Sequence, residues 1–157
     1  MKSKILALRI NRRALGVALL SRDALLLGDG RHLPSNPKRA AVSLSRWIQR
    51  WLAQTPDATV VLDTPASADG TSMRKLLEGI DTLLMEGRVV PVRVSKPEIL
   101  SAYGLRPARS RQEVREIVAT FWPKLSELSG RIAPFAADAA AAALLAQYQS
   151  ALQPEQT

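Results

Sequence analysis

Three short apolar runs, 4–10, 14–20 and 24–27, open the chain and are separated by polar turns. Runs of this length bounded by turn residues are typical of buried strands, and short turns join antiparallel neighbours. The pattern therefore predicts an antiparallel meander, in which the Gly-Asp-Gly segment 28–30 bends or ends the third strand. Within the first run, Arg9 is the one polar residue after Lys4.

A helical period follows the meander. Asn36 and Pro37 supply a capping residue and a proline at the first helical position, which mark a helix start. Tryptophans on such a helix are more often core residues than platforms for stacked bases. Spacings of three and four residues predict one apolar face, made of Ala41, Leu44, Ile48, Trp51 and Leu52, with Trp47 beside it.

Strands and helices alternate through the rest of the chain. We expect a buried strand at 59–62 ending at Asp63, a helix from about 71 capped by Gly87, and a strand at 88–94. A short helix at 95–103 and a basic loop at 105–111 follow. The chain then forms a helix at 114–121, which Pro123 kinks or ends, and a last helix at 134–148. Pro91 places the 88–94 strand at a sheet edge or a bulge.

This order of elements predicts an α/β fold. We expect a mixed five-stranded sheet, with three antiparallel strands first and parallel strands after them, and helices on both faces. The length is that of one domain, which we place at residues 1–152, followed by a frayed tail at 153–157.

The composition is that of a basic globular protein. Of 157 residues, 46% are hydrophobic, and sixteen arginines and six lysines bring the net charge to +8. The apolar fraction excludes a disordered tail, and the arginine excess suits phosphate, which a planar guanidinium binds bidentately. Cysteine is absent, which removes thiolate chemistry and fits a cytoplasmic location. We expect no membrane partner, because charged residues interrupt every long apolar stretch.

Two aspartates stand in strongly apolar surroundings. Asp63 ends the strand at 59–62, and Asp138 lies in the alanine-rich start of the last helix. A buried carboxylate is unfavourable unless it is paired or used. Plain structural roles are also open: Asp63 as a turn residue, Asp138 as an acid at a helix N-terminus, and Arg9 as an exposed strand end.

Three segments, in this order, resemble the RuvC type of Holliday-junction resolvase, within the RNase H-like superfamily. They are the run 5–9 with Gly16, the segment 94–104 followed by Arg109-Ser-Arg111-Gln-Glu-Val114, and Phe135-Ala-Ala-Asp138-Ala. The resemblance spans Lys4 to Gln149. It implies an RNase H-like fold, a homodimer, and DNA, branched DNA included, rather than RNA as the partner. In active members it implies a nuclease whose carboxylates hold two Mg²⁺ ions at the scissile phosphate.

Residue by residue, the resemblance implies a degenerate catalytic site. The acid at the end of the first strand falls on Arg9, and the first acid of the last helix falls on Phe135. Asp63 and Asp138 keep the other two acidic positions, and Arg111 takes the place of the family's basic residue. Because Arg9 puts a fixed positive charge where a cation would sit, we predict no bound cofactor and no cleavage. We also predict that Arg9 pairs with Asp63 or Asp138 and that Phe135 fills the space of a lost ligand.

Basic side chains near this site are expected to contact phosphate, although the same loop is compatible with simple solvation. They are Arg12, Arg13, Arg106, Arg109 and Arg111. Two other functions stay open. One is an active Mg²⁺-dependent nuclease, of the junction or RNA-processing type, in which Asp69 or Glu113 joins the two aspartates as a metal ligand. The other is a non-catalytic scaffold that dimerises through its helices. His32, the single histidine, is expected at the surface.

Overall fold

A five-stranded sheet forms the centre of the computed structural model, which describes residues 4–65, 70–104 and 106–152. The strands are β1 (Lys4–Ile10), β2 (Ala14–Ser21), β3 (Ala24–His32), β4 (Thr59–Asp63) and β5 (Val92–Val94), in the order β3-β2-β1-β4-β5. The first three strands pair antiparallel, and β4 and β5 add in parallel beside β1. The predicted mixed sheet is confirmed.

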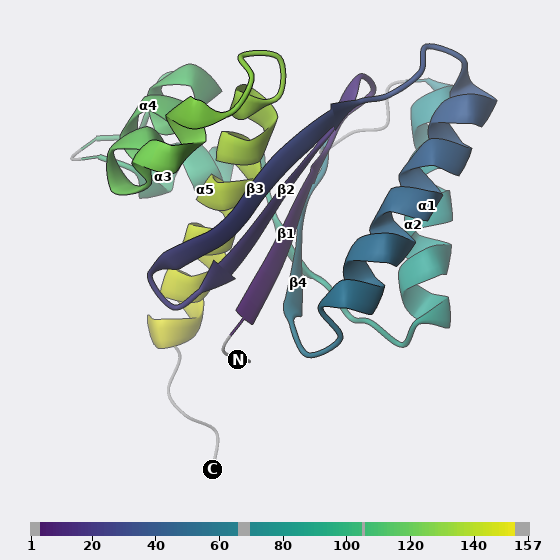
Figure 1. Ribbon diagram of the computed structural model, residues 1–157, viewed down its shortest axis with the longest axis horizontal. Coiled ribbons are helices and arrows are strands. Elements are labelled where there is room, and N and C mark those ends of the chain that lie inside the picture. Colours follow the sequence, from purple (N-terminus) through teal and green to yellow (C-terminus); the bar gives the residue numbers. More distant parts are fainter. Residues whose placement is uncertain (1–3, 66–69, 105, 153–157) are drawn as a thin grey trace.

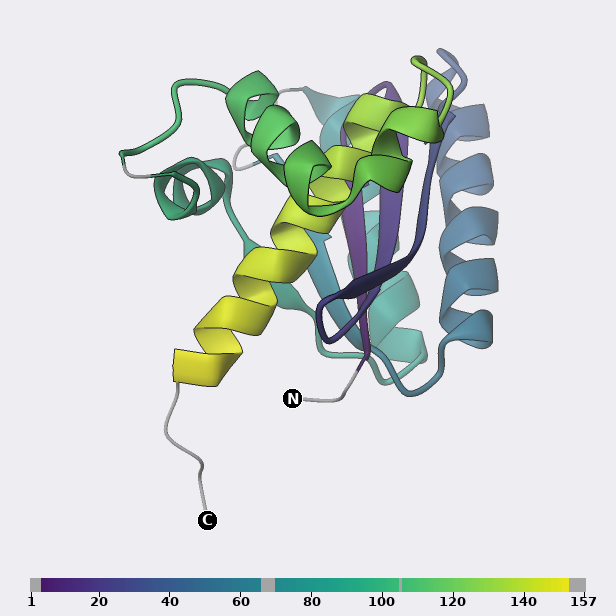
Figure 2. The ribbon, with the colours of Figure 1, turned by 60° about the vertical axis from the view of Figure 1, so that its left-hand side comes forward.

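Helices cover both faces of the sheet, as predicted (Figure 1). On one face lie α1 (Pro37–Gln54) and α2 (Thr71–Glu86). On the other lie α3 (Lys96–Ala102), α4 (Arg111–Phe121) and α5 (Ala133–Leu152), and a short 3-10 helix, η1 (Pro123–Glu127), leads from α4 toward α5 (Figure 2). Within the described residues, no helix is both long and apolar enough to cross a membrane.

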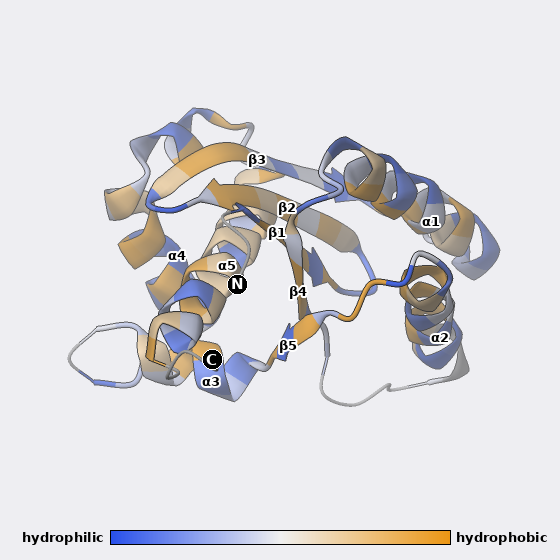
Figure 3. Ribbon diagram, turned by 90° about the horizontal axis from the view of Figure 1, so that it is seen from below, coloured by the Kyte–Doolittle hydropathy of each residue, from blue (hydrophilic) through white to orange (hydrophobic). Residues whose placement is uncertain are grey.

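The sheet separates two hydrophobic cores, and the residues of β1 alternate between them. Ile5 and Ala7 belong to the core under α5, whereas Leu6 and Leu8 belong to the core under α1 and α2. A strand buried on both faces reads as a continuous apolar run, which explains the sequence of this segment. In Figure 3 the central strands are mainly hydrophobic, while α1 and α2 carry hydrophilic residues between hydrophobic ones.

The buried face of α1 differs from the predicted face by a rotation of about one residue. The helix begins as expected, because the Asn36 side chain accepts hydrogen bonds from the first-turn backbone N–H groups. However, Ala41 is exposed, and Trp51 is half-buried. The buried side chains are Ala40, Leu44, Trp47 and Ile48. Burying the large indole of Trp47 removes far more apolar area from water than burying the methyl group of Ala41, so packing selects this rotation.

Two strand lengths differ from the prediction. The segment 28–30 does not end β3, which continues to His32. In contrast, β5 keeps only three of the seven residues expected at 88–94. Arg88 follows the capping residue Gly87 with a positive φ of 57°, and Pro91 has no N–H for a ladder hydrogen bond, so the strand begins after both. β5 lies at the sheet edge, as we predicted from the position of Pro91. The expected tail at 153–157 lies outside the described residues.

Glycines in β2 and β3 allow α5 to approach the sheet backbone to backbone. A Cβ on Gly16 would stand 2.0 Å from the carbonyl oxygen of Phe135, and one on Gly30 would stand 2.9 Å from that of Ile132. Both distances are shorter than a van der Waals contact. The start of α5 therefore packs directly against the backbone of β2 and β3. The buried alanines that follow keep the rest of the helix close to the sheet.

We expect Gly16→Ala to lower the free energy of unfolding by about 3 kcal/mol or more, because the new methyl group meets backbone rather than a flexible side chain. Chemical denaturation monitored by circular dichroism measures this change. The matched control is Gly79→Ala, since nothing lies within 4 Å of a Cβ at this exposed position of α2. It should stabilise the protein by about 0.5–1 kcal/mol. Equal effects of the two substitutions would contradict the close approach of α5.

Candidate functional site

Two buried aspartates converge where β1 and β4 end. Asp63, the last residue of β4, is paired in register with Arg9 of β1, so both side chains leave the same face of the sheet. Ala7 and Val61, two residues earlier in each strand, contact the core under α5, so this face is the one that α5 covers. Asp138 reaches the same place from α5, and the two aspartates are 0% and 3% exposed.

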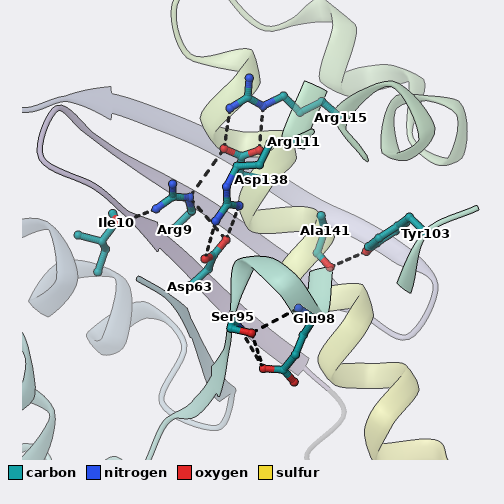
Figure 4. Close-up of polar contacts among 10 residues, drawn as sticks. All are labelled: Arg9, Ile10, Asp63, Ser95, Glu98, Tyr103, Arg111, Arg115, Asp138 and Ala141. Atoms are coloured by element: carbon teal, nitrogen blue, oxygen red, sulfur yellow. Dashed lines mark hydrogen bonds and ion pairs between the residues drawn. The ribbon is translucent and has the colours of Figure 1, made fainter. Parts of the chain in front are cut away.

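Helix α4 supplies a bidentate arginine to each aspartate (Figure 4). Nη1 and Nη2 of Arg111 donate to Oδ2 and Oδ1 of Asp63 at 2.8 and 3.0 Å. Nε and Nη2 of Arg115 donate to Oδ1 and Oδ2 of Asp138 at 2.8 and 2.9 Å. The hydrogen bonds that Asp138 accepts from Arg115 raise the pKa of this arginine. Paired charges of this kind satisfy a buried carboxylate far better than neutral donors do.

The two arginines lie one turn apart on α4, so they share one side of the helix. The same side carries the buried Val114 and Val118, which pack into the core under α5. The helix is oriented at its start by Ser110, whose side chain accepts the backbone N–H of Glu113. The apolar contacts of α4 therefore aim Arg111 and Arg115 at the sheet end.

Arg9 lies between the two ion pairs. Its Nε stands 3.5 Å from Oδ2 of Asp63 and 3.9 Å from Oδ2 of Asp138, so the predicted pairing is confirmed for both acids. The contact is ionic without a hydrogen bond, because the buried Nε has no hydrogen-bond partner, while Nη1 donates to the carbonyl of Ile10. Burial lowers the pKa of Arg9 and the Asp63 charge opposes this, yet a guanidinium stays protonated at neutral pH.

Three arginines and two aspartates give this arginine–aspartate cluster a formal charge of +1. All four carboxylate oxygens already accept hydrogen bonds from guanidinium groups. A hard divalent cation needs those same oxygens as ligands. Within the part of the chain that the structure describes, no group of three or more His, Cys, Asp or Glu side chains could hold a metal ion. These residues therefore do not fit Mg²⁺.

The other candidate ligands are placed elsewhere. Glu113 accepts the backbone N–H of Arg109 at the start of α4. Asp69 lies outside the described residues. The half-buried ring of Phe135 stands edge-on to His32 with 5.3 Å between centroids, and its filling of a lost ligand's space stays a prediction. His32 is exposed, as expected. Asp138 is not in the first turn of α5, which excludes its role as an N-terminal helix acid.

The five arginines expected to bind phosphate divide into two groups. Arg12 and Arg13 are exposed in the turn that directly follows β1, and Arg106 and Arg109 are exposed in the segment before α4. Arg111 differs, because it is the first residue of α4 rather than a loop residue, and its side chain is 13% exposed. The basic loop was therefore predicted one residue too long. Phosphate binding by the four exposed arginines stays a prediction.

The sequence matches no protein-family model and no curated protein. Among solved structures, Thermus thermophilus RuvC in complex with Holliday junction substrate matches with a TM-score of 0.73 and 15% identity, over 94% of this chain and 94% of that chain. The chain has the RuvC fold. A second Thermus thermophilus RuvC structure gives a TM-score of 0.74 and 14% identity, over 95% of this chain and 96% of that chain. The predicted RuvC-type fold is thus confirmed across nearly the whole chain.

The sequence did not predict one member of the arginine–aspartate cluster, Arg115. Arg115 directly follows Val114 in the apolar stripe of α4 and stands four residues after Arg111. Two arginines at that spacing, alternating along one helix face with Val114 and Val118, indicate a face that carries charge into the interior. Two buried acids also need more than one positive charge beside them. The spacing of the arginines and the number of buried acids together identify Arg115 from the sequence.

Removing one arginine of the cluster should destabilise the protein strongly. We expect Arg111→Gln to lower the free energy of unfolding by about 3 kcal/mol, because Asp63 stays buried with only the longer Arg9 contact. The matched control is Arg93→Gln, which breaks a single ion pair with Asp81 whose side chains are about half exposed. That change should cost at most about 0.5 kcal/mol. If urea denaturation gave similar losses of unfolding free energy for both variants, burial would not distinguish the Arg111–Asp63 pair from the Arg93–Asp81 pair.

Proposed function

We propose that this protein is a RuvC-like nucleic-acid-binding protein that does not cleave its ligand. One observation carries the proposal: each buried aspartate at the sheet end is already bound bidentately by an arginine of α4. Arg9 adds a third guanidinium beside them. An acidic centre that would attract cations is replaced by a cluster with a small excess of positive charge.

The chemistry of guanidinium separates binding from cleavage. Hydrolysis by two metal ions needs one ion to activate water and another to stabilise the leaving oxygen. A guanidinium can bind a phosphate oxygen, but it has no acceptor site and does not lose its proton, so it cannot act as the base that activates water. Arg9, Arg111 and Arg115 supply positive charge and no base. This end of the sheet is suited to hold a phosphate without breaking it.

We further propose DNA, branched DNA included, as the partner, and a homodimer in the cytoplasm as the acting form. The RuvC structure that matches over 94% of both chains holds a Holliday junction substrate, which supports DNA as the partner. The net charge of +8 supports a polyanionic partner in general. Arg12 and Arg13, exposed in the turn after β1, add positive charge to the surface.

The first test is cleavage against binding. The purified protein is mixed with a labelled four-way junction in Mg²⁺ and, separately, in EDTA. We expect binding in both buffers and intact DNA strands after long incubation, because no vacant carboxylate oxygen is left in the cluster for the ion. A nicked product that requires Mg²⁺ and disappears in Asp63→Asn would overturn the proposal and favour an active nuclease. No binding at low salt would favour the scaffold alternative.

The second test concerns the exposed arginines before α4. Replacing Arg106 and Arg109 by Gln should weaken junction binding and reduce the slope of log affinity against log salt by about 1.8, the value for two lost phosphate contacts. Arg111 is left unchanged, since it supports the fold. The control pair is Lys4→Gln with Arg22→Gln, which removes the same charge at the opposite end of the strands. An unchanged slope in the first pair would show that this segment does not touch phosphate.

A further inference from the structure

A basic groove lies on the face of the molecule opposite the aspartates, along α1. Its volume is about 520 Å³, and its walls come from α1 and the end of β3. Its charged lining residues are Arg31, Lys38, Arg39, Arg46 and Arg50, and no acidic side chain lines it. The whole of α1, eighteen residues long, contains no Asp or Glu. We call this feature the α1 groove.

We propose that the α1 groove binds the sugar-phosphate backbone of duplex nucleic acid, as a second contact surface separate from the arginine–aspartate cluster. The inference rests on the proposed nucleic-acid binding but not on the loss of cleavage. The α1 groove is lined by α1 and the end of β3, whereas the cluster is covered by α4 and α5. These helices lie on opposite faces of the sheet (Figure 1). One duplex arm can therefore lie in the groove while another reaches the sheet end.

The spacing of the cations matches a phosphate strand. Arg39, Arg46 and Arg50 stand seven and four residues apart, so they follow one side of the helix. With a rise of about 1.5 Å per residue, this row extends for about 16 Å. One strand of a duplex carries a phosphate about every 3.4 Å along its axis, so the row spans about five phosphates. Lys38 extends the row at the N-terminal end, and Arg31 stands on the facing wall.

Trp47 fixes one wall of the groove and excludes base stacking as its main role. The Arg31 guanidinium lies 4.1 Å from the centre of the Trp47 ring, and the indole itself is 7% exposed. Its accessible face is thus covered by a cation and is closed to a nucleobase. A guanidinium held on an aromatic ring loses less conformational freedom when it binds phosphate. The groove is therefore suited to backbone and not to base recognition.

A nucleic acid fits this surface better than an acidic membrane does. A membrane-binding helix inserts an apolar face with large side chains into the lipid boundary. The apolar face of α1 is already packed into the core by Leu44, Trp47 and Ile48. Of the residues lining the groove, Val42 is the exposed large hydrophobic one. A row of charges with a single exposed valine beside it favours a polyanion with regularly spaced phosphates over a lipid surface.

The test is the salt dependence of duplex binding, measured by fluorescence anisotropy with a labelled 20-base-pair duplex. The groove variant carries Arg39→Gln, Arg46→Gln and Arg50→Gln. The control variant carries Lys4→Gln, Arg22→Gln and Arg88→Gln, exposed residues outside the groove that give the same charge loss. We expect the groove variant to lose about 2.7 from the salt slope and at least about tenfold in affinity. The control should keep the slope of the unmodified protein.

Each outcome separates this inference from the proposed function. Equal slopes for the two triple variants overturn the α1 groove and leave the nucleic-acid function standing. No duplex binding by the unmodified protein at low salt overturns both. Binding to phosphatidylserine vesicles, lost in the groove variant and without duplex binding, would assign the groove to membranes instead. In the unmodified protein, duplex should shift the backbone amide resonances of residues 38–50. Absence of these shifts under saturating duplex contradicts the proposal even if the variants fail to fold.

Discussion

Two carboxylates buried at one end of a sheet need positive charge beside them, since an isolated ionised acid in an apolar interior is strongly unfavourable. In this protein Arg111 and Arg115 meet that need directly, and Arg9 lies between the pairs. The positions of β1, β4, α4 and α5 are tied together through these contacts. The cluster joins four elements that are far apart in sequence, so it acts as a structural centre as well as a site.

The sequence was sufficient for the parts of the fold governed by local pattern. The meander, the start of α1 at Asn36 and the end of α4 before Pro123 were all predicted, because capping, proline and alternation act over a few residues. The pairing of Arg9 with Asp63 was also predicted, since the parallel order of β1 and β4 brings two strand ends together. The confirmed RuvC-type fold adds no chemistry by itself, because one fold carries many functions.

What the sequence did not reveal depends on contacts between distant elements. The rotation of α1, which buries Trp47 in place of Ala41, follows from competition for the core and not from helical spacing alone. Gly30 was expected to bend or end the third strand, but both it and Gly16 allow the close approach of α5. Arg115 was passed over because a charged residue beside an apolar stripe usually faces solvent. Its role appears only once α4 is placed over Asp138.

The register that sets Arg9 opposite Asp63 has an evolutionary consequence. Exchange of Arg9 for an acid removes one positive charge and adds one negative charge, so a single substitution turns the formal charge of the cluster from +1 to −1. Arg111 and Arg115 would still bind their aspartates, and the added carboxylate would be the unmatched group seeking a cation. A cluster with an excess of positive charge and one with an excess of negative charge therefore differ by a single residue of β1.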